Sequence, residues 1–238
     1  MMKRLFISCL LIACATLTMA QAAPGTFSII PRVGVSISNI SNNPLYIGNA
    51  DYSLNAKAKA GFAVGADAYY QASRQIGVSA GVHYVSVGNK YDDYDVLTER
   101  PAEDATEAKY EAYTDLSNTL NYVAVPLMVH AYIANGLSVN AGVRAGLLTH
   151  VKEEFTTCTF VQNIHTGVRT YNSDVTKTEN TSDALYNKVD FSIPVGISYE
   201  YMNVVLDVRY NVGLTHVRKY SNSKNRSAML TVGYKFDL

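Results

Sequence analysis

Apolar and polar residues alternate along most of the chain after about residue 26, and a two-residue period is typical of β-strands with one apolar face. In the run from Phe27 to Ser38, the odd positions are mostly apolar and the even positions mostly small or polar. Seven further runs repeat this pattern: GFAVGADAYYQ, IGVSAGVHYVS, NYVAVPLMVHAYI, LSVNAGVRAGLL, KVDFSIPVGISYE, VVLDVRYNVGL and MLTVGYKFDL. The sequence therefore predicts an all-β fold with eight strands.

Short and long connections alternate between these runs. ASRQ, ANG and YMN each join two runs at hairpin length. The other connections are much longer, at about 40–59, 88–118, 150–186 and 215–227. An even number of strands with this alternation is typical of transmembrane barrels with short periplasmic turns and long extracellular loops. We therefore expect an eight-stranded antiparallel transmembrane β-barrel, an up-and-down meander integral to the outer membrane.

The polar face of the strands carries charges of both signs, whereas the opposite face is almost free of charge and suits contact with lipid. Side chains fill the interior of a small barrel, so opposite charges on its inner face are expected to pair. The residues predicted to form this network are Arg32, Asp67, Arg144, Lys188, Asp190, Glu200, Asp207, Arg209, Lys235 and Asp237.

The first 22 residues have the pattern of a secretory signal peptide. MMKR is positively charged, LFISCLLIACA is apolar, and AQA is a small-x-small cleavage site, with TMA ending at Ala20 as an alternative. A lipoprotein signal that ends at Cys14 is the rival interpretation, but the apolar run continues past this residue. We expect residues 1–22 to be cleaved and residues 23–238 to form one barrel domain. Cys158 is then the remaining cysteine, so no intramolecular disulfide forms.

The last strand carries a pattern that resembles the C-terminal signal read by the barrel-assembly machinery. The pattern consists of Thr231, Gly233, Phe236 and Leu238, and Leu238 departs from the Phe on which many such proteins end. This strand is also expected to pair with the first one, because lipid does not tolerate an open sheet edge. The assembly machinery is therefore an expected partner during insertion.

Several segments resemble PorT-like outer-membrane β-barrel proteins, in the order GVSISNI, KAGFAVGADAYY, NYVAVPLMVHAYI, GVRAGLL and RYNVGLTHV. The resemblance spans nearly the whole chain after the signal peptide, and NYVAVPL and RYNVGL are its most specific pieces. It implies the fold and the compartment. The family's named member is implicated in protein secretion and maturation, so the resemblance also implies a secretion-system protein partner. The chain is also similar to OmpA/OmpX-type barrels, without the periplasmic domain of the OmpA type.

The sequence gives little support for catalysis or nucleic-acid binding. The 20 Lys and Arg residues balance the 20 Asp and Glu residues, so the chain has no net positive charge that would attract nucleic acid. An omptin-like protease would pair His and Asp at the outer rim, where His216 could meet Asp92 or Asp93, but such enzymes have ten strands. A palmitoyl-transferase-like barrel needs an N-terminal helix for which there is no room. We expect no enzymatic activity and no cofactor.

The second long connection is acidic. Asp92, Asp93 and Asp95 are oxygen ligands of the kind that calcium prefers, but their spacing matches no EF-hand loop, so no metal site is expected. The segment RPAEDATEAKYEAY predicts a short helix with Pro101 at its first position.

The fourth long connection is basic. We expect Arg218, Lys219, Lys224 and Arg226 to contact lipopolysaccharide phosphates or the acidic second connection.

The third long connection alternates in part, so its flanking strands are expected to extend as a hairpin beyond the membrane. An exposed edge of this kind can recruit partners by strand addition, and a mobile surface loop is the alternative. The predicted function is a non-enzymatic scaffold barrel whose loops bind partners, among them outer-membrane lipid, lipopolysaccharide and a secretion component. The alternatives are a narrow porin-like channel, a surface adhesion barrel and, last, a rim hydrolase.

Overall fold

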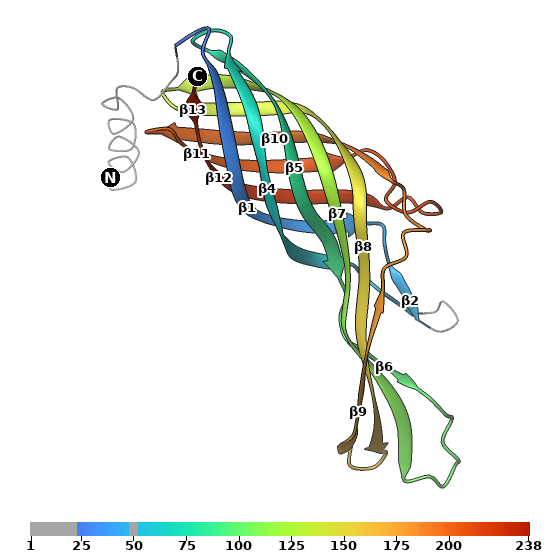
Figure 1. Ribbon diagram of the computed structural model, residues 1–238. Coiled ribbons are helices and arrows are strands. Elements are labelled where there is room, and N and C mark those ends of the chain that lie inside the picture. The colour runs from blue at the N-terminus through green and yellow to red at the C-terminus, as the bar shows by residue number, and fades with distance from the viewer. Residues whose placement is uncertain (1–22, 48–51) are drawn as a thin grey trace, which may run out of the picture.

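The computed structural model describes residues 23–47 and 52–238, so the predicted signal peptide lies outside the described residues. The described chain is built from β-strands and turns, and they form an elongated body with a narrow extension at one end (Figure 1). Within these residues, no helix is long and apolar enough to cross a membrane.

Eight of the described strands pair in a closed ring, each antiparallel to its neighbours. The expected antiparallel up-and-down order is confirmed, because each ring strand pairs with the next one along the chain and the last pairs with the first. The ring strands are β1 (Phe27–Ser41), β4 (Lys57–Gln71), β5 (Ile76–Lys90), β7 (Glu107–Ala134), β8 (Leu137–Asn163), β10 (Val189–Tyr201), β11 (Val204–Gly213) and β12 (Lys224–Tyr234). A short strand, β13 (Phe236–Asp237), follows β12 and also pairs with β1.

The two ends of the ring differ in their connections. At the short-turn end, residues 72–75, 135–136 and 202–203 join neighbouring strands. At the long-loop end, the connections carry strands of their own, namely the β2 (Leu45–Ile47) and β3 (Tyr52–Leu54) pair, β6 (Tyr94–Leu97) and β9 (Arg169–Asn180).

The ring is apolar outside and polar inside, the reverse of a water-soluble protein. On β1, Val33 and Val35 are more than half exposed, whereas Arg32, which precedes Val33, and Ser36, which follows Val35, are almost fully buried. The same alternation holds on β10, β11 and β12, whose burial patterns change at nearly every residue. Strict two-residue periodicity therefore sends one set of side chains inward and the other outward.

Two ring strands are unusually long and continue beyond the ring. β7 has 28 residues and β8 has 27, and their outer halves separate from the ring and pair with β6 and β9 (Figure 1). We call these four paired segments, β6, Glu107–Thr114, Thr156–Asn163 and β9, the projecting sheet. The helix predicted from RPAEDATEAKYEAY is wrong, because its second half forms the start of β7 and pairs with β8.

Candidate functional site

The centre of the ring holds a buried three-residue network. The Arg32 Nε lies 2.6 Å from one carboxylate oxygen of Asp67, and the Nε2 of His83 lies 2.8 Å from the other. All three side chains are almost completely buried. Strand register brings these side chains together. Asp67 on β4 pairs with Ile30 on β1 and with Gly81 on β5. Arg32 and His83 each lie two residues further along their strands and on the same face, within reach of Asp67.

Two further buried ion pairs fill the interior. The Arg209 Nη2 donates to a carboxylate oxygen of Asp207 at 3.2 Å, and Ser198 donates to that same oxygen at 2.6 Å. Nearer the short-turn end, the Lys235 ammonium lies 3.0–3.1 Å from both oxygens of Glu200 and 4.7 Å from the centre of the Tyr69 ring. Charges that leave water on folding require such partners.

The remaining members of the predicted network lie nearer the two ends. Arg144 and Asp190 are buried, with their closest nitrogen and oxygen 4.0 Å apart. Asp237 is exposed at the short-turn end and accepts a hydrogen bond from Ser28 at 2.7 Å. Lys188 departs from the prediction, because its ammonium is exposed at the long-loop end and pairs with Asp183 there. The two-residue period breaks down where β10 begins, which explains why position alone misplaced this lysine.

Very little empty space is left among these side chains. A cavity near the short-turn end, lined by residues that include Arg32, His130 and Lys235, has a volume of about 10 Å³. Such a volume holds about one water molecule. Near the short-turn end, the interior of the ring is therefore filled by side chains and is not an open channel.

The long-loop end of the ring is closed by a latch. The Tyr186 hydroxyl donates to Glu153 at 2.5 Å, and the Arg218 Nη2 lies 2.8 Å from the same Glu153 oxygen. The Arg218 guanidinium also lies over the Tyr186 ring, 5.2 Å from its centre. Beneath the latch lies an apolar cluster that includes Leu120, Val151 and Val217, so polar and apolar layers together cover the mouth.

In the basic fourth connection, Arg218 and Lys219 do not contact the acidic second connection. Arg218 is engaged in the latch, and the Lys219 ammonium donates to the backbone oxygen of Ala184 at 2.6 Å. Lys224 and Arg226 belong to β12. Of the four predicted phosphate contacts, Arg218 is thus engaged in the latch and Lys219 in a contact with the neighbouring loop.

The projecting sheet has a small core of its own. Phe160 is 1% exposed, and the rings of Tyr110 and Tyr171 lie 5.2 Å and 5.1 Å from it. Arg169 on β9 stacks on Phe160 at 4.8 Å and forms an ion pair with Asp95 on β6 at 3.0 Å. Since β6 and β9 are the two edges of the sheet, this pair shows that the sheet curls around Phe160.

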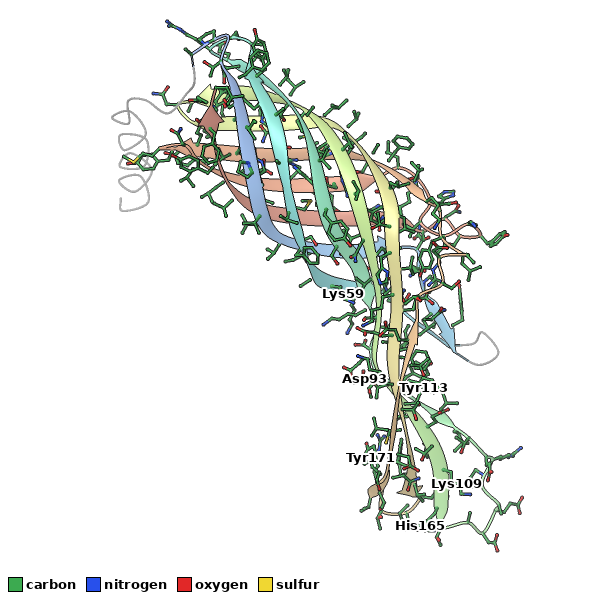
Figure 2. All side chains as sticks on the ribbon, viewed as in Figure 1. Lys59, Asp93, Lys109, Tyr113, His165 and Tyr171 are labelled. Atoms are coloured by element: carbon green, nitrogen blue, oxygen red, sulfur yellow. The ribbon has the colours of Figure 1, made fainter. Side chains whose placement is uncertain are left out.

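One edge of the projecting sheet offers a long unpaired backbone. β9 pairs with β8 on one side and, among the described residues, with no strand on the other. Nearly all of its 12 residues are exposed, among them Tyr171 and Val175 (Figure 2). A long exposed edge of this kind is a template for another strand.

The residues proposed for a rim hydrolase lie in separate places. His216 lines a shallow pocket with Lys188, Leu214 and Thr215. Asp92 and Asp93 line a different pocket beside β4 and β5. In the part of the chain that the structure describes, no group of three or more His, Cys, Asp or Glu side chains could hold a metal ion.

The residues of the predicted assembly signal divide between the two faces of the ring. Thr231 is buried opposite Gly34, and Gly233 is paired with Arg32. Phe236 and Leu238 are exposed, and the Phe236 ring contacts that of Tyr234.

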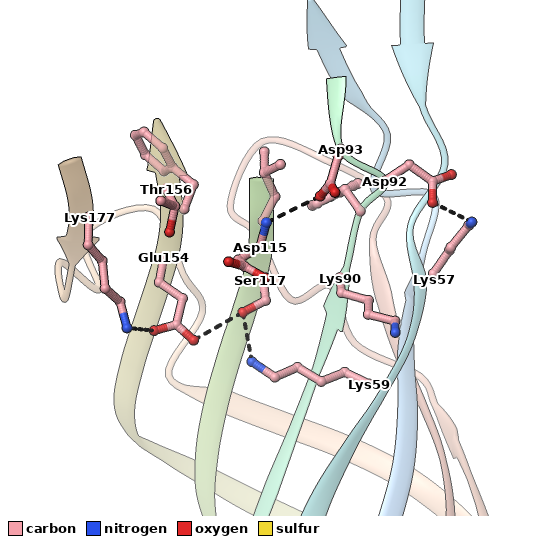
Figure 3. Close-up of a pocket in the computed structure, with 13 residues that line it drawn as sticks. Lys57, Lys59, Lys90, Asp92, Asp93, Asp115, Ser117, Glu154, Thr156 and Lys177 are labelled. Atoms are coloured by element: carbon pink, nitrogen blue, oxygen red, sulfur yellow. Dashed lines mark hydrogen bonds and ion pairs between the residues drawn. The ribbon is translucent and has the colours of Figure 1, made fainter. Parts of the chain in front are cut away.

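A polar pocket outside the ring was not anticipated from the sequence. It has a volume of about 600 Å³ and lies where β7 and β8 leave the ring, beside the start of β4 and the end of β5 (Figure 3). We call it the lysine pocket. Its charged lining residues are Lys57, Lys59, Lys90, Asp92, Asp93, Asp115, Glu154 and Lys177. A hydrogen bond from Lys152 lowers the pKa of Glu154, so this carboxylate stays ionised.

Comparison with known families agrees with the fold. Residues 19–219 match the family described as "outer membrane protein beta-barrel domain". Because the match covers most of the chain, the protein belongs to this family of integral outer-membrane β-barrel proteins. No curated protein matches the chain.

A comparison with solved structures finds distant likenesses to outer-membrane proteins. Ail of Yersinia pestis, in complex with the heparin analogue sucrose octasulfate, is 17% identical with a TM-score of 0.43, covering 89% of this chain and 99% of its own. Neisserial surface protein A is 14% identical with a TM-score of 0.41, covering 88% and 96%. OprG of Pseudomonas aeruginosa is 10% identical with a TM-score of 0.37, covering 92% and 99%. With identities of 17% or less and TM-scores below 0.5, these likenesses carry no argument about this chain, and the family assignment rests on the match of residues 19–219.

Proposed function

We propose that this protein is a non-enzymatic outer-membrane scaffold that displays the projecting sheet outside the cell and binds a partner protein along β9. The observation that carries the proposal is the free edge of β9, 12 residues long and exposed. A partner segment in extended conformation would gain backbone hydrogen bonds along this edge. Exposed side chains such as Tyr171 and Val175 would then select among partners.

The proposal places the short-turn end in the periplasm and the long-loop end outside. Short periplasmic turns and long external loops are the usual arrangement of these barrels. The eight ring strands form the transmembrane unit, and the projecting sheet then stands in the extracellular space. The PorT-like resemblance suggests a secretion component as the partner, and that component would be recognised by an extended segment that adds to β9.

A scaffold is favoured over a channel by the packing of the interior. Buried pairs such as Arg32 with Asp67 and Lys235 with Glu200 occupy the ring, and the latch covers its mouth. A scaffold is favoured over a rim hydrolase by the separation of His216 from Asp93 into different pockets.

The test removes the edge while keeping the ring. Thr156 and Lys177 are directly opposite each other on β8 and β9, so residues 157–176 can be replaced by an Asn-Gly turn, which suits a two-residue hairpin. Tagged wild-type and shortened proteins are isolated in mild detergent from outer membranes of the native cells. We expect a stoichiometric protein partner with the wild type and none with the shortened protein.

The control shortens a different connection. Replacing residues 99–106 with a short Gly-Ser linker removes acidic surface but leaves β9 intact. This variant should keep the partner. Retention of the partner by the variant without residues 157–176 would contradict binding at β9, and recovery of the barrel without any protein would contradict the scaffold function.

A further inference from the structure

The lysine pocket lies on the outer face of the barrel wall, immediately beyond the apolar surface. On β7, Leu116, Asn118 and Leu120 are buried, so the intervening Ser117 and Thr119 face outward. Further along the same outer face, Val125 and Leu127 are exposed and apolar. The pocket therefore begins where the apolar belt ends, at the level at which a membrane lipid changes from acyl chain to headgroup.

A β-bulge brings the lysines to this face. The register between β4 and β5 shifts between Ala58 and Ala63, where β4 has one extra residue. Side chains at the start of β4 therefore face the opposite side of the sheet from the one that the alternation along the rest of β4 would give them. Ala58 now pairs with the buried Asn89, so Lys57 lies opposite Lys90 and Lys59 also faces outward. Figure 2 places Lys59 on the outside of the wall, where the projecting sheet begins.

Three ammonium groups meet here with few carboxylate partners. Lys57 and Lys90 are direct cross-strand neighbours, and like charges in that position repel each other. Lys57 reaches Asp92 at 2.5 Å, but both side chains are more than half exposed, which makes the pair weak. Lys90 is paired through its backbone with β4 and β7, but among the described residues its ammonium has no hydrogen bond or ion pair.

Lys59 is held in place by hydroxyl groups instead of a carboxylate. Its ammonium crosses β5 beside Gly88 and donates to Ser117 at 2.9 Å and to Thr119 at 2.5 Å on β7. The side chain is only partly exposed. Both groups that accept a hydrogen bond from this ammonium are neutral, so no carboxylate occupies its direct contacts and an anion can approach it from outside.

The opposite side of the pocket carries the carboxylates of Glu154 and Asp115 together with the Lys177 ammonium. Glu154 accepts a hydrogen bond from Ser117 at 3.3 Å and pairs with Lys152 at 2.8 Å and Lys177 at 3.4 Å, and Asp115 is exposed nearby (Figure 3). A ligand that fits both sides carries an anion at one end and hydroxyl or amino donors at the other. A phosphorylated sugar has this combination.

We propose that the lysine pocket binds the phosphorylated saccharide headgroup of a membrane glycolipid, with the phosphate between Lys59 and Lys90 and the sugar hydroxyls toward Glu154 and Asp115. The lipid source follows from position, because the pocket adjoins the apolar belt on the same outer face. The acyl chains would lie along the exposed apolar residues of β4 and β7, such as Phe62 and Val125. Lys177 of β9 lines the pocket, but the phosphate would lie between lysines of β4 and β5, so binding there does not use the free edge of β9.

The test uses the full chain in non-ionic detergent, with native mass spectrometry as the readout. The probes are lipid A, a diphosphorylated glycolipid, and the same lipid after enzymatic dephosphorylation. We expect retention of the phosphorylated form by the wild type and about tenfold weaker retention by K59Q/K90Q, the loss that charge-assisted hydrogen bonds of ordinary strength imply. The dephosphorylated lipid should bind both proteins equally weakly.

The matched control is K109Q/K188Q, which removes two exposed positive charges away from the pocket. It should bind lipid A as the wild type does, and heat-modifiable gel mobility should show that both variants are folded. Equal binding by K59Q/K90Q and the wild type would overturn the site, as would an equal loss in the control. Displacement of lipid A by millimolar inorganic phosphate would contradict the proposal that the bound phosphate belongs to a glycolipid, and would indicate a soluble phosphate ligand instead.

Discussion

Arg169 on β9 and Asp95 on β6 lie 3.0 Å apart and join the two edges of the projecting sheet. The two strands are not neighbours in the sheet, since β7 and β8 lie between them. The ion pair and the stacking of Arg169 on Phe160 together keep the sheet curled around a small aromatic core. This contact makes the projection an ordered structure with a defined free edge.

Replacing Arg169 with Ala should loosen β6 without unfolding the ring. The pair is partly exposed, so the expected loss is about 1 kcal/mol or less from the ion pair, with a further ~0.5–1 kcal/mol from the stacking. Hydrogen exchange should become faster in residues 94–97 and stay unchanged in β1 and β12. Lys109→Ala breaks a longer, more exposed pair with Glu99 and should leave exchange unchanged. Equal protection of β6 in wild type and Arg169→Ala would refute the role of this contact.

Replacing Asp67 with Ala should strongly destabilise the barrel. The substitution leaves the buried Arg32 guanidinium without its carboxylate, and removal of one partner of a buried pair costs about 3–5 kcal/mol. The change in the free energy of unfolding can be measured by urea unfolding in detergent micelles. Circular dichroism is the probe, because the chain contains no tryptophan. Lys57→Ala breaks an exposed pair with Asp92 and should cost no more than about 1 kcal/mol. A loss of similar size in the two variants would show that the interior network is not a major source of stability.

Gly34 is expected to be necessary for closing the ring. A Cβ at this position would lie 2.0 Å from the backbone oxygen of Leu230 on β12, so Gly34→Ala must push β1 and β12 apart. We expect a loss of about 2 kcal/mol or more, since overpacking against backbone is poorly relieved. In Gly146→Ala the nearest atom would be 3.3 Å away on the Tyr122 side chain, and most protein should still fold. The folded fraction on heat-modifiable gels compares the two, and equal yields would argue against closure at Gly34.

The wild-type barrel should not conduct ions. Buried ion pairs occupy the inside of the ring, and the latch of Tyr186, Glu153 and Arg218 spans its mouth. Planar-bilayer recordings are therefore expected to stay at background. Discrete current steps from the purified protein, absent from a mock preparation, would support the narrow channel instead.

The strand order and the inside of the barrel could largely be predicted from the sequence, because both depend on local two-residue alternation. Arg32, Asp67, Arg209 and Lys235 are buried in pairs as their positions on the strands suggest. Lys188 is the exception, since it lies where alternation gives way to a loop.

The structure beyond the ring was less predictable, because it depends on contacts between distant segments. Ala108 and Ala112 sit four residues apart among good helix formers, which favours a helix locally. Pairing with residues near Phe160, about 50 positions later, overrides this preference. The lysine pocket likewise depends on a single extra residue in β4, and a bulge of this kind leaves no clear signal in the alternation of Lys57 and Lys59 with their neighbours.

β7 runs from the short-turn end to the tip of the projecting sheet, through 28 residues and roughly 90 Å at about 3.3 Å per residue, with a register shift against β8 between Thr114 and Ser117. A pulling force on the tip would therefore act along the strand axis and load many backbone hydrogen bonds at once. Bonds loaded together in shear resist far more than bonds opened one at a time. The projecting sheet is thus mechanically continuous with its membrane anchor, and a partner held there could transmit tension directly to the barrel wall.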